Sequence, residues 1–334
     1  MDKRLIALAL LLFIAALSPA RGQSIDDYNK RGKSRLNSGD WDGAIADFTQ
    51  VIQLDPKLAE AYSNRGIAKY CAGDHDAAAA DEEQALKIDP KDAQAWYYRG
   101  LVKYGKGDTD GALADFNRSI EIDPKDADVF NNRGNAKDDK GDFIGAIADY
   151  NKVIELDPKY SAAYNNRGNA ERDKGDTNAA ISDFTRAIAL DPKYGLAYRN
   201  RANAKNAAGD ADGAMADYNK AIEVDPKYAD AYVDRGGAKY EKHDYDGAIA
   251  DYNKAIELNP ADEDAYNNRG NAKDDKGDHD GAIADYSHVI DIDAKNADAW
   301  FNRGLAEKAK GDTVKAVADF NKAHELNPKI SPPK

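Results

Sequence analysis

The dipeptide Arg-Gly recurs along this chain at intervals of 34 residues, and no other feature of the sequence restricts the fold as strongly. The pair begins at positions 31, 65, 99, 133, 167, 235, 269 and 303, and Arg201-Ala202 fills the remaining place in the series. A fixed period of this length is typical of an array whose units pack only against their neighbours. We therefore divide residues 25–330 into nine tandem repeats, which begin at positions 25, 59, 93, 127, 161, 195, 229, 263 and 297.

Each repeat contains two apolar stripes with helical spacing. Position 4 is always aromatic and position 8 is glycine except at Ala202, whereas position 20 is always alanine and position 24 is Phe or Tyr except at Glu82. A Gly-Asp pair such as Gly39-Asp40 separates the stripes, where glycine can end the first helix and aspartate can cap the second. A proline such as Pro56 follows the second stripe and ends it. The pattern predicts an all-α fold of nine helix-turn-helix hairpins.

This pattern resembles the tetratricopeptide repeat (TPR) family over residues 25–330. The resemblance implies a right-handed α-solenoid whose first helices line a concave groove and expose positions 2, 5, 6, 9, 12 and 13. The departures are local: arginine occupies position 7 in every repeat, a polar residue occupies position 11, Glu82 replaces an aromatic residue and Ala294 replaces proline.

Arginine at position 7 always occurs together with aspartate at position 23, as in Arg31 and Asp47. Each lies at the edge of an apolar stripe. We expect the two to pair within a hairpin and to join its helices, with about 1 kcal/mol or less per pair if the side chains stay partly exposed.

Position 6 is asparagine in six of the nine repeats. An amide side chain both donates and accepts a hydrogen bond, so a row of amides can follow an extended peptide backbone. The row resembles the asparagine ladder in the repeat superhelix of O-linked N-acetylglucosamine transferase, where such residues hold the substrate peptide. The alternative is that duplication copied a solvated polar face, because residues 131–142 recur unchanged at 267–278. The predicted backbone-binding residues are Asn64, Asn132, Asn166, Asn200, Asn268 and Asn302.

The same face carries more acidic than basic residues, among them Asp138, Asp139, Asp274 and Asp275. A surface of one sign concentrates ligands of the other sign, so we expect a basic or neutral extended segment as the ligand. The net charge of −13 makes nucleic-acid binding improbable. We find no nucleophile with its base and no metal-ligand spacing, so we predict no catalysis, no metal and no cofactor.

The first 22 residues indicate an export signal: two basic residues precede 13 apolar residues, Leu5 to Leu17, and then small residues suited to cleavage. Thirteen apolar residues are too few to cross a bilayer, which needs roughly 20. We expect a periplasmic or secreted protein that is not inserted in a membrane after cleavage. Residues 331–334 are expected to form a disordered tail.

Taken together, the sequence predicts a non-catalytic scaffold that binds a protein or peptide client in its concave groove. The alternative is a structural scaffold that acts through self-association, as a homo-oligomer, or through its convex surface.

Overall fold

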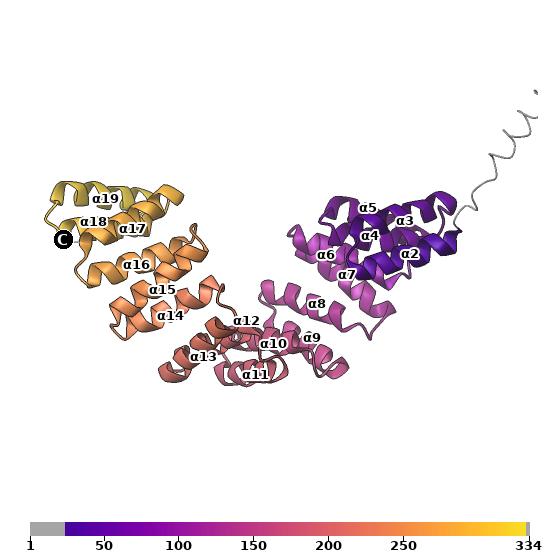
Figure 1. Ribbon diagram of the computed structural model, residues 1–334, viewed down its shortest axis with the longest axis horizontal. Helices are drawn as coiled ribbons and strands as arrows, with labels where there is room; N and C mark the ends of the chain where they lie inside the picture. The colour runs from indigo at the N-terminus through magenta and orange to yellow at the C-terminus, as the bar shows by residue number, and fades with distance from the viewer. Residues whose placement is uncertain (1–23, 332–334) are drawn as a thin grey trace, which may run out of the picture. The chain divides into compact units, whose positions relative to one another are not determined.

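The computed structural model describes residues 24–331, and within them it contains eighteen α-helices and no strand. The predicted signal peptide, residues 1–22, and most of the predicted tail lie outside the described residues. Figure 1 shows the helices as successive antiparallel pairs, one pair for each repeat. The first helices are α2 Ile25–Ser38, α4 Ala59–Cys71, α6 Ala93–Gly105, α8 Ala127–Asp139, α10 Ser161–Asp173, α12 Gly195–Ala207, α14 Ala229–Glu241, α16 Glu263–Asp275 and α18 Ala297–Ala309. The second helices are α3 Trp41–Leu54, α5 His75–Ile88, α7 Thr109–Ile122, α9 Phe143–Leu156, α11 Thr177–Leu190, α13 Ala211–Val224, α15 Tyr245–Leu258, α17 His279–Ile292 and α19 Thr313–Leu326. The prediction of an all-α solenoid of hairpins is confirmed.

The turn inside each hairpin follows the predicted chemistry. Gly39 has φ 80°, a left-handed conformation that a glycine adopts without strain, and Asp40 accepts a hydrogen bond from the Gly43 amide at 3.0 Å. Repeat 7 places His243 at the same turn with φ 60°, which is unusual for a residue with a side chain. The regular turn makes each hairpin bend at the same point of its 34 residues.

In eight of the nine hairpins the core is a contact between the ring at position 24 and the backbone at position 8, and in repeat 2 Glu82 takes the place of the ring. A Cβ atom at Gly100 would lie 2.6 Å from the Phe116 ring, so no side chain fits there. Neighbouring repeats complete the core: Ala180 and Phe184 pack with Ala204 of the next repeat, and Ile181 packs against this cluster. Because each hairpin buries the stripe of the next, no hairpin is covered on its own.

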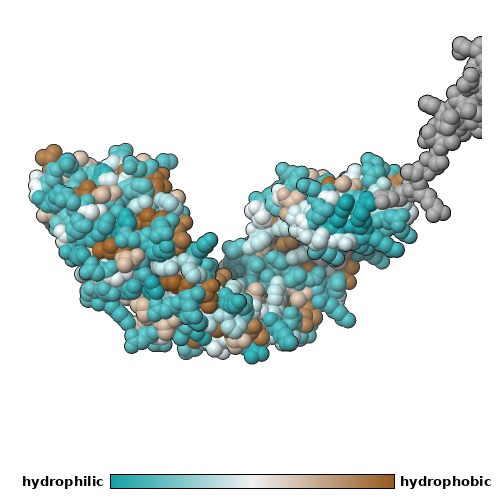
Figure 2. All heavy atoms as spheres, viewed as in Figure 1, coloured by the Kyte–Doolittle hydropathy of each residue, from teal (hydrophilic) through white to brown (hydrophobic). Residues whose placement is uncertain are grey.

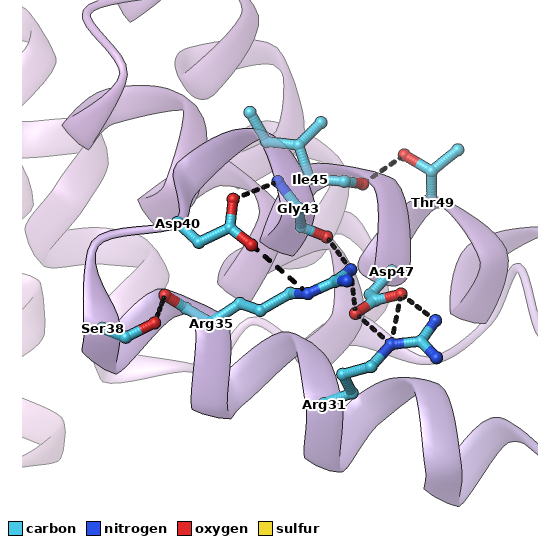
Figure 3. Close-up of polar contacts among 8 residues, drawn as sticks. All are labelled: Arg31, Arg35, Ser38, Asp40, Gly43, Ile45, Asp47 and Thr49. Carbon is cyan, nitrogen blue, oxygen red and sulfur yellow. Dashed lines mark hydrogen bonds and ion pairs between the residues drawn. The ribbon is translucent and has the colours of Figure 1, made fainter.

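The predicted Arg-Asp pairs form in all nine repeats. In repeat 3 the Arg99 guanidinium donates to both oxygens of Asp115, at 2.8 and 2.7 Å. Figure 3 shows the same arrangement in repeat 1, where Arg31 of α2 reaches Asp47 of α3 and Arg35 donates to Asp47 as well. The sequence estimate assumed partly exposed pairs, but Asp115 is only 2% exposed. The estimate for an exposed pair therefore does not apply, and removing one partner would leave a buried charge without its counter-ion.

Position 11 completes the ion pair in seven repeats with a second basic residue; Lys103, for example, lies 2.8 Å from Asp115. Repeats 5 and 9 have Glu171 and Glu307 at this position instead. Burial, and next the carboxylate of Asp183, raise the pKa of Glu171 to about 7. These two hairpins thus hold two carboxyl groups where the others hold one carboxylate between two cations.

The helices gather into two compact units that divide between Lys152 and Val153, within α9. Each unit is described by itself below. Figure 2 shows that hydrophilic residues cover most of the visible surface of each unit.

The buried ion pair leads to a first prediction. Asp115→Asn should lower the free energy of unfolding by about 2 to 3 kcal/mol, because Arg99 and Lys103 would face a neutral amide in a partly buried site. Urea unfolding monitored by circular dichroism measures the change. The control is Asp76→Asn, which removes a surface carboxylate paired with Lys106, with a side chain 88% exposed, and should leave the transition unchanged. Equal effects of the two substitutions would contradict this assignment.

The carboxyl pair of repeat 5 leads to a second prediction. The folded-state pKa of Glu171, about 7, exceeds its unfolded value of 4.5, so the folded protein holds the proton more tightly and loses stability as pH rises from 4.5 to 7. Glu171→Lys should stabilise the protein by on the order of 1 kcal/mol at pH 8 and by less at pH 4.5.

Thermal unfolding at several pH values tests this prediction. Glu171→Gln serves as the matched variant, since it removes the titrating group without adding a cation. Glu171→Gln should weaken the pH dependence of the unfolding temperature and should stabilise the protein less than Glu171→Lys does. A gain from lysine that is the same at pH 4.5 and pH 8 would show that repulsion between the carboxyl groups is not the cause.

Candidate functional site

Positions 2, 5, 6, 9, 12 and 13 of the first helices form the surface that we call the groove face. Three depressions lie on it, one in the first unit and two in the second. Most of their lining residues come from these six positions.

The depression in the first unit, which we call the N-terminal hollow, has a volume of about 580 Å³ and spans repeats 1 to 3. It contains the predicted Asn64, which is buried and whose amide nitrogen has no hydrogen-bond partner among residues 24–331. The Lys33 ammonium lies 2.5 Å from Glu60 at its rim. Its lining residues are Lys33, Leu36, Asn37, Trp41, Glu60, Ser63, Asn64, Ile67, Cys71, Asp92, Gln94 and Tyr98.

A second depression, the acidic hollow, brings together three predicted residues. Its volume is about 170 Å³, and it is lined by Tyr240, Asn271, Asp274, Asp275, Tyr286, Asn302 and Leu305. The Tyr240 hydroxyl donates to Asp275, and this bond raises the pKa of Tyr240 to about 12. Burial, and next the carboxylate of Asp274, raise the pKa of Tyr286. No basic residue lines this hollow, so its field favours a positive ligand.

The third depression, of about 220 Å³, contains an internal cation. Arg199 donates to Asp234 at 2.6 Å and to Asp230 at 3.0 Å, and its guanidinium lies 5.6 Å from the centre of the Tyr228 ring. Asp262 and Asp264 also line it. An arginine of the chain itself is thus held among carboxylates and beside an aromatic ring.

Asp138 and Asp139 occupy in repeat 4 the places that Asp274 and Asp275 occupy in repeat 8. The Tyr104 hydroxyl donates to Asp139, and the Tyr150 hydroxyl donates to Asn135 at 2.8 Å. Repeat 8 shows the corresponding bonds from Tyr240 to Asp275 and from Tyr286 to Asn271. Each unit therefore carries one copy of the same set of acids and tyrosines.

The six predicted asparagines do not share one environment. Asn200 is buried and donates to Asn165 of the preceding repeat at 2.9 Å, and Asn132 donates to Tyr97 of the preceding repeat, also at 2.9 Å. Asn166 accepts from its neighbour Asn165 at 3.3 Å.

The half-buried Asn268 and Asn302 make no hydrogen bond within the described chain. The amides without an internal hydrogen bond among residues 24–331 are therefore Asn64, Asn268 and Asn302.

Sequence reasoning missed the polar residues beside these amides. Ser63 and Glu82 are buried in repeat 2 next to the N-terminal hollow, and neither side chain has a hydrogen-bond partner of acceptable geometry among the described residues. A signal was present, because repeat 2 lacks the aromatic residue of position 24 and has a small polar residue at position 5.

Among residues 24–331 no three His, Cys, Asp or Glu side chains are grouped as metal ligands would be. None of the described helices has the length and apolar character needed to span a bilayer.

Three family models match the chain. A TPR repeat model matches residues 202–242, 236–273 and 275–311. One tetratricopeptide repeat model matches residues 29–93 and 72–127. A second tetratricopeptide repeat model matches residues 127–160, 161–194 and 297–330. No curated protein sequence gives a significant match.

Solved structures also resemble the chain. A tetratricopeptide repeat protein from Parabacteroides merdae is 22% identical with a TM-score of 0.57, over 71% of this chain and 94% of that one. The APC/C hetero-tetramer Cut9-Hcn1 gives 17% identity and a TM-score of 0.61, over 87% of this chain and 58% of the other. The C-terminal part of a TPR repeat-containing protein from Cytophaga hutchinsonii is 20% identical with a TM-score of 0.54, over 72% of this chain and 98% of that one. At these identities the likeness concerns the fold.

The matched segments together extend over most of residues 29–330, and three of them, 127–160, 161–194 and 297–330, each coincide with one observed hairpin. The chain belongs to the tetratricopeptide repeat family.

Proposed function

We propose that this protein is an exported, non-catalytic scaffold that binds an extended, basic or neutral peptide segment on its groove face. The observation that carries the proposal is the acidic hollow, where Asn302, Asp274 and Asp275 meet and no basic residue lies among the lining side chains. Proteins of the tetratricopeptide repeat family generally mediate protein-protein interactions. The signal peptide that the sequence predicts over residues 1–22 is the basis for proposing export.

The amides supply contacts that do not depend on the ligand sequence. Asn302 can donate to a peptide carbonyl and accept from a peptide amide, because neither its oxygen nor its nitrogen is used within the described chain. Asn64 and Asn268 offer similar groups in repeats 2 and 8. This is the role that the resemblance to the asparagine ladder implies.

The carboxylates supply selectivity for charge. Asp274 and Asp275 lie side by side at the end of α16, and their partners are His279, 2.5 Å from Asp274, and the neutral Tyr240 hydroxyl. A lysine or arginine of the ligand would find carboxylates there without having to displace an internal lysine or arginine.

A second candidate function is self-association. Two apolar residues of α19 are unusually exposed: Val314 is 80% exposed and Val317 is 56% exposed. An apolar patch of this kind can bind a second copy of the chain.

Charge selection leads to a third prediction. The double substitution Asp274→Asn and Asp275→Asn should weaken binding of a lysine- and arginine-rich peptide by on the order of tenfold at low ionic strength and flatten its dependence on salt. Titration calorimetry at several salt concentrations measures both effects. The control is Asp42→Asn with Asp291→Asn, which changes the net charge equally on exposed second-helix residues. A control as damaging as the test variant would mean that the total charge, and not this site, attracts the peptide.

The amides lead to a fourth prediction, which separates the two candidate functions. Asn268→Ala with Asn302→Ala should reduce peptide binding and leave the mass in solution unchanged, because these side chains serve no internal contact. Calorimetry and light scattering give the two readouts, and Asn178→Ala, on the exposed side of α11, is the control. If Val314→Ser with Val317→Ser changes the mass while the asparagine variant binds normally, self-association is the better account.

A further inference from the structure

Repeat 2 has a carboxyl group where the other eight repeats have an aromatic ring. Glu82 lies against Gly66 inside the hairpin, with 0% of its surface exposed, and neither carboxyl oxygen has a hydrogen-bond partner of acceptable geometry. Burial, reinforced by Asp92 and Asp81, raises the pKa of Glu82 to about 10, although Ser63 and Arg99 act in the opposite direction. A phenylalanine would fill this place at a lower free-energy cost, because it has no polar group to desolvate. A buried carboxyl group without a hydrogen-bond partner therefore points to a functional role.

In repeats 3 and 9 an aromatic ring at position 5 covers the residue at position 24, and repeat 2 lacks such a ring. The Tyr97 ring in repeat 3 lies 6.0 Å from the Phe116 ring, and the Phe301 ring in repeat 9 lies 5.5 Å from the Phe320 ring. In repeat 2 the residue at position 5 is Ser63, which lines the N-terminal hollow. A single small side chain thus stands between the hollow and the carboxyl group.

Among residues 24–331, Ser63 Oγ, Asn64 Nδ2 and both carboxyl oxygens of Glu82 are buried without a hydrogen-bond partner of acceptable geometry, although Ser63 is close enough to Glu82 to lower its pKa. Ser63 is 3% exposed and Asn64 is 8% exposed, so water does not readily satisfy them. Each such group is costly when unpaired and becomes favourable when a ligand supplies its partner. The hollow is therefore built for a ligand that brings both hydrogen-bond donors and an acceptor.

The charges and rings around the hollow indicate the sign and shape of that ligand. Glu60 and Asp92 are its acidic residues, and Lys33, paired with Glu60, is its only basic residue. Trp41 and Tyr98 line it as well. Carboxylates beside aromatic rings suit a guanidinium, which is planar, stacks on rings and donates several hydrogen bonds. The chain holds its own Arg199 in similar surroundings, between two aspartates and the Tyr228 ring.

Resting on the proposed function, we infer that the N-terminal hollow binds one arginine side chain of the client peptide, which donates to the Ser63 hydroxyl while Asn64 donates to a backbone carbonyl of the client. Ser63 in turn donates its own proton to Glu82. The guanidinium of the client is therefore linked to the Glu82 carboxyl group through the Ser63 hydroxyl.

The arrangement couples binding to a proton. A positive charge near Ser63 stabilises the carboxylate form of Glu82, so the carboxyl proton leaves to the buffer when the arginine enters. Asp81, Asp92, Arg99 and Tyr98 interact electrostatically with Glu82, and Lys33, Glu60 and Cys71 line the same hollow. The hydroxyl proton of Ser63 stays on the serine, and no covalent bond changes.

The test uses the full chain and an extended peptide with one arginine among glycine, serine and alanine, with matched peptides that carry citrulline or lysine instead. Calorimetry at pH 8 in two buffers of different ionisation enthalpy should show release of up to one proton per arginine peptide and about tenfold weaker binding of the citrulline peptide. Glu82→Gln should abolish the proton release and most of the preference for arginine. Glu307→Gln, a buried carboxyl group of repeat 9, should change neither.

Two further variants protect this test against a folding defect. Glu82→Phe restores the residue type of the other repeats, so it should raise the unfolding temperature and still lose the arginine preference. Ser63→Ala should lose it too. Proton release that persists in Glu82→Gln, or equal binding of the arginine and citrulline peptides, would overturn the inference. If both peptides bind equally but their binding depends on Asn268 and Asn302, the proposed function stands and the inference about the N-terminal hollow fails. If no peptide binds, the proposed function and this inference both fail.

Cys71 provides an independent readout, because it is the single cysteine of the sequence and lines the N-terminal hollow. The arginine peptide should slow alkylation of Cys71 in the wild-type protein and much less in Glu82→Phe. Equal protection of Cys71 in the two proteins would mean that the peptide binds in the hollow without an interaction with Glu82.

Discussion

The contact between a glycine at position 8 and a side chain at position 24 sets the distance between the two helices in eight of the nine hairpins, and in repeat 6 Ala202 takes the place of the glycine. The glycine has no side chain, so the ring lies directly on the backbone of the first helix, as Phe116 lies on Gly100. That closeness brings arginine at position 7 within hydrogen-bond distance of aspartate at position 23. In repeat 3, for example, Arg99 Nη2 lies 2.7 Å from Asp115 Oδ1. It also lets a long side chain at position 24 reach the groove face. The Tyr150, Tyr218 and Tyr286 hydroxyls each donate to an asparagine at position 9.

The residue at position 24 therefore decides what lies beneath the groove face. Phenylalanine leaves the asparagine of position 9 without this bond, as in repeat 5, where the Asn169 oxygen has no partner within the described part of the chain. Tyrosine fixes that asparagine, and Glu82 in repeat 2 offers a carboxyl group. A single core position thus joins the packing of the hairpin to the chemistry of the surface, and ligand-binding properties can differ between repeats that fold alike.

The fold could be predicted from the sequence almost completely, because its determinants are local and repeated nine times. Glycine at a left-handed turn, aspartate at the helix start and the spacing of Arg31 and Asp47 each act within one hairpin. The groove could be predicted only in part, since its contacts run between repeats at a spacing of 35 residues. Asn200 and Asn132 donate to position 5 of the preceding repeat, and that position varies along the chain. A row that looks uniform at position 6 consequently contains both occupied and available amides.

Stability and recognition are thus carried by different positions of the repeat. The nine Arg-Asp pairs and the buried alanines hardly vary, and they hold every hairpin in the same geometry. Positions 5, 9 and 12 change from repeat to repeat, and the acidic set of repeat 4 returns only in repeat 8. Duplication explains why the two sets are identical, but it does not explain why Arg199 and Glu82 depart from the pattern. Arg199 and Glu82 each place an ionisable group beside a hollow, which is what selection for a ligand would produce. We therefore propose that the departures from the repeat, more than its regularity, mark where a ligand binds.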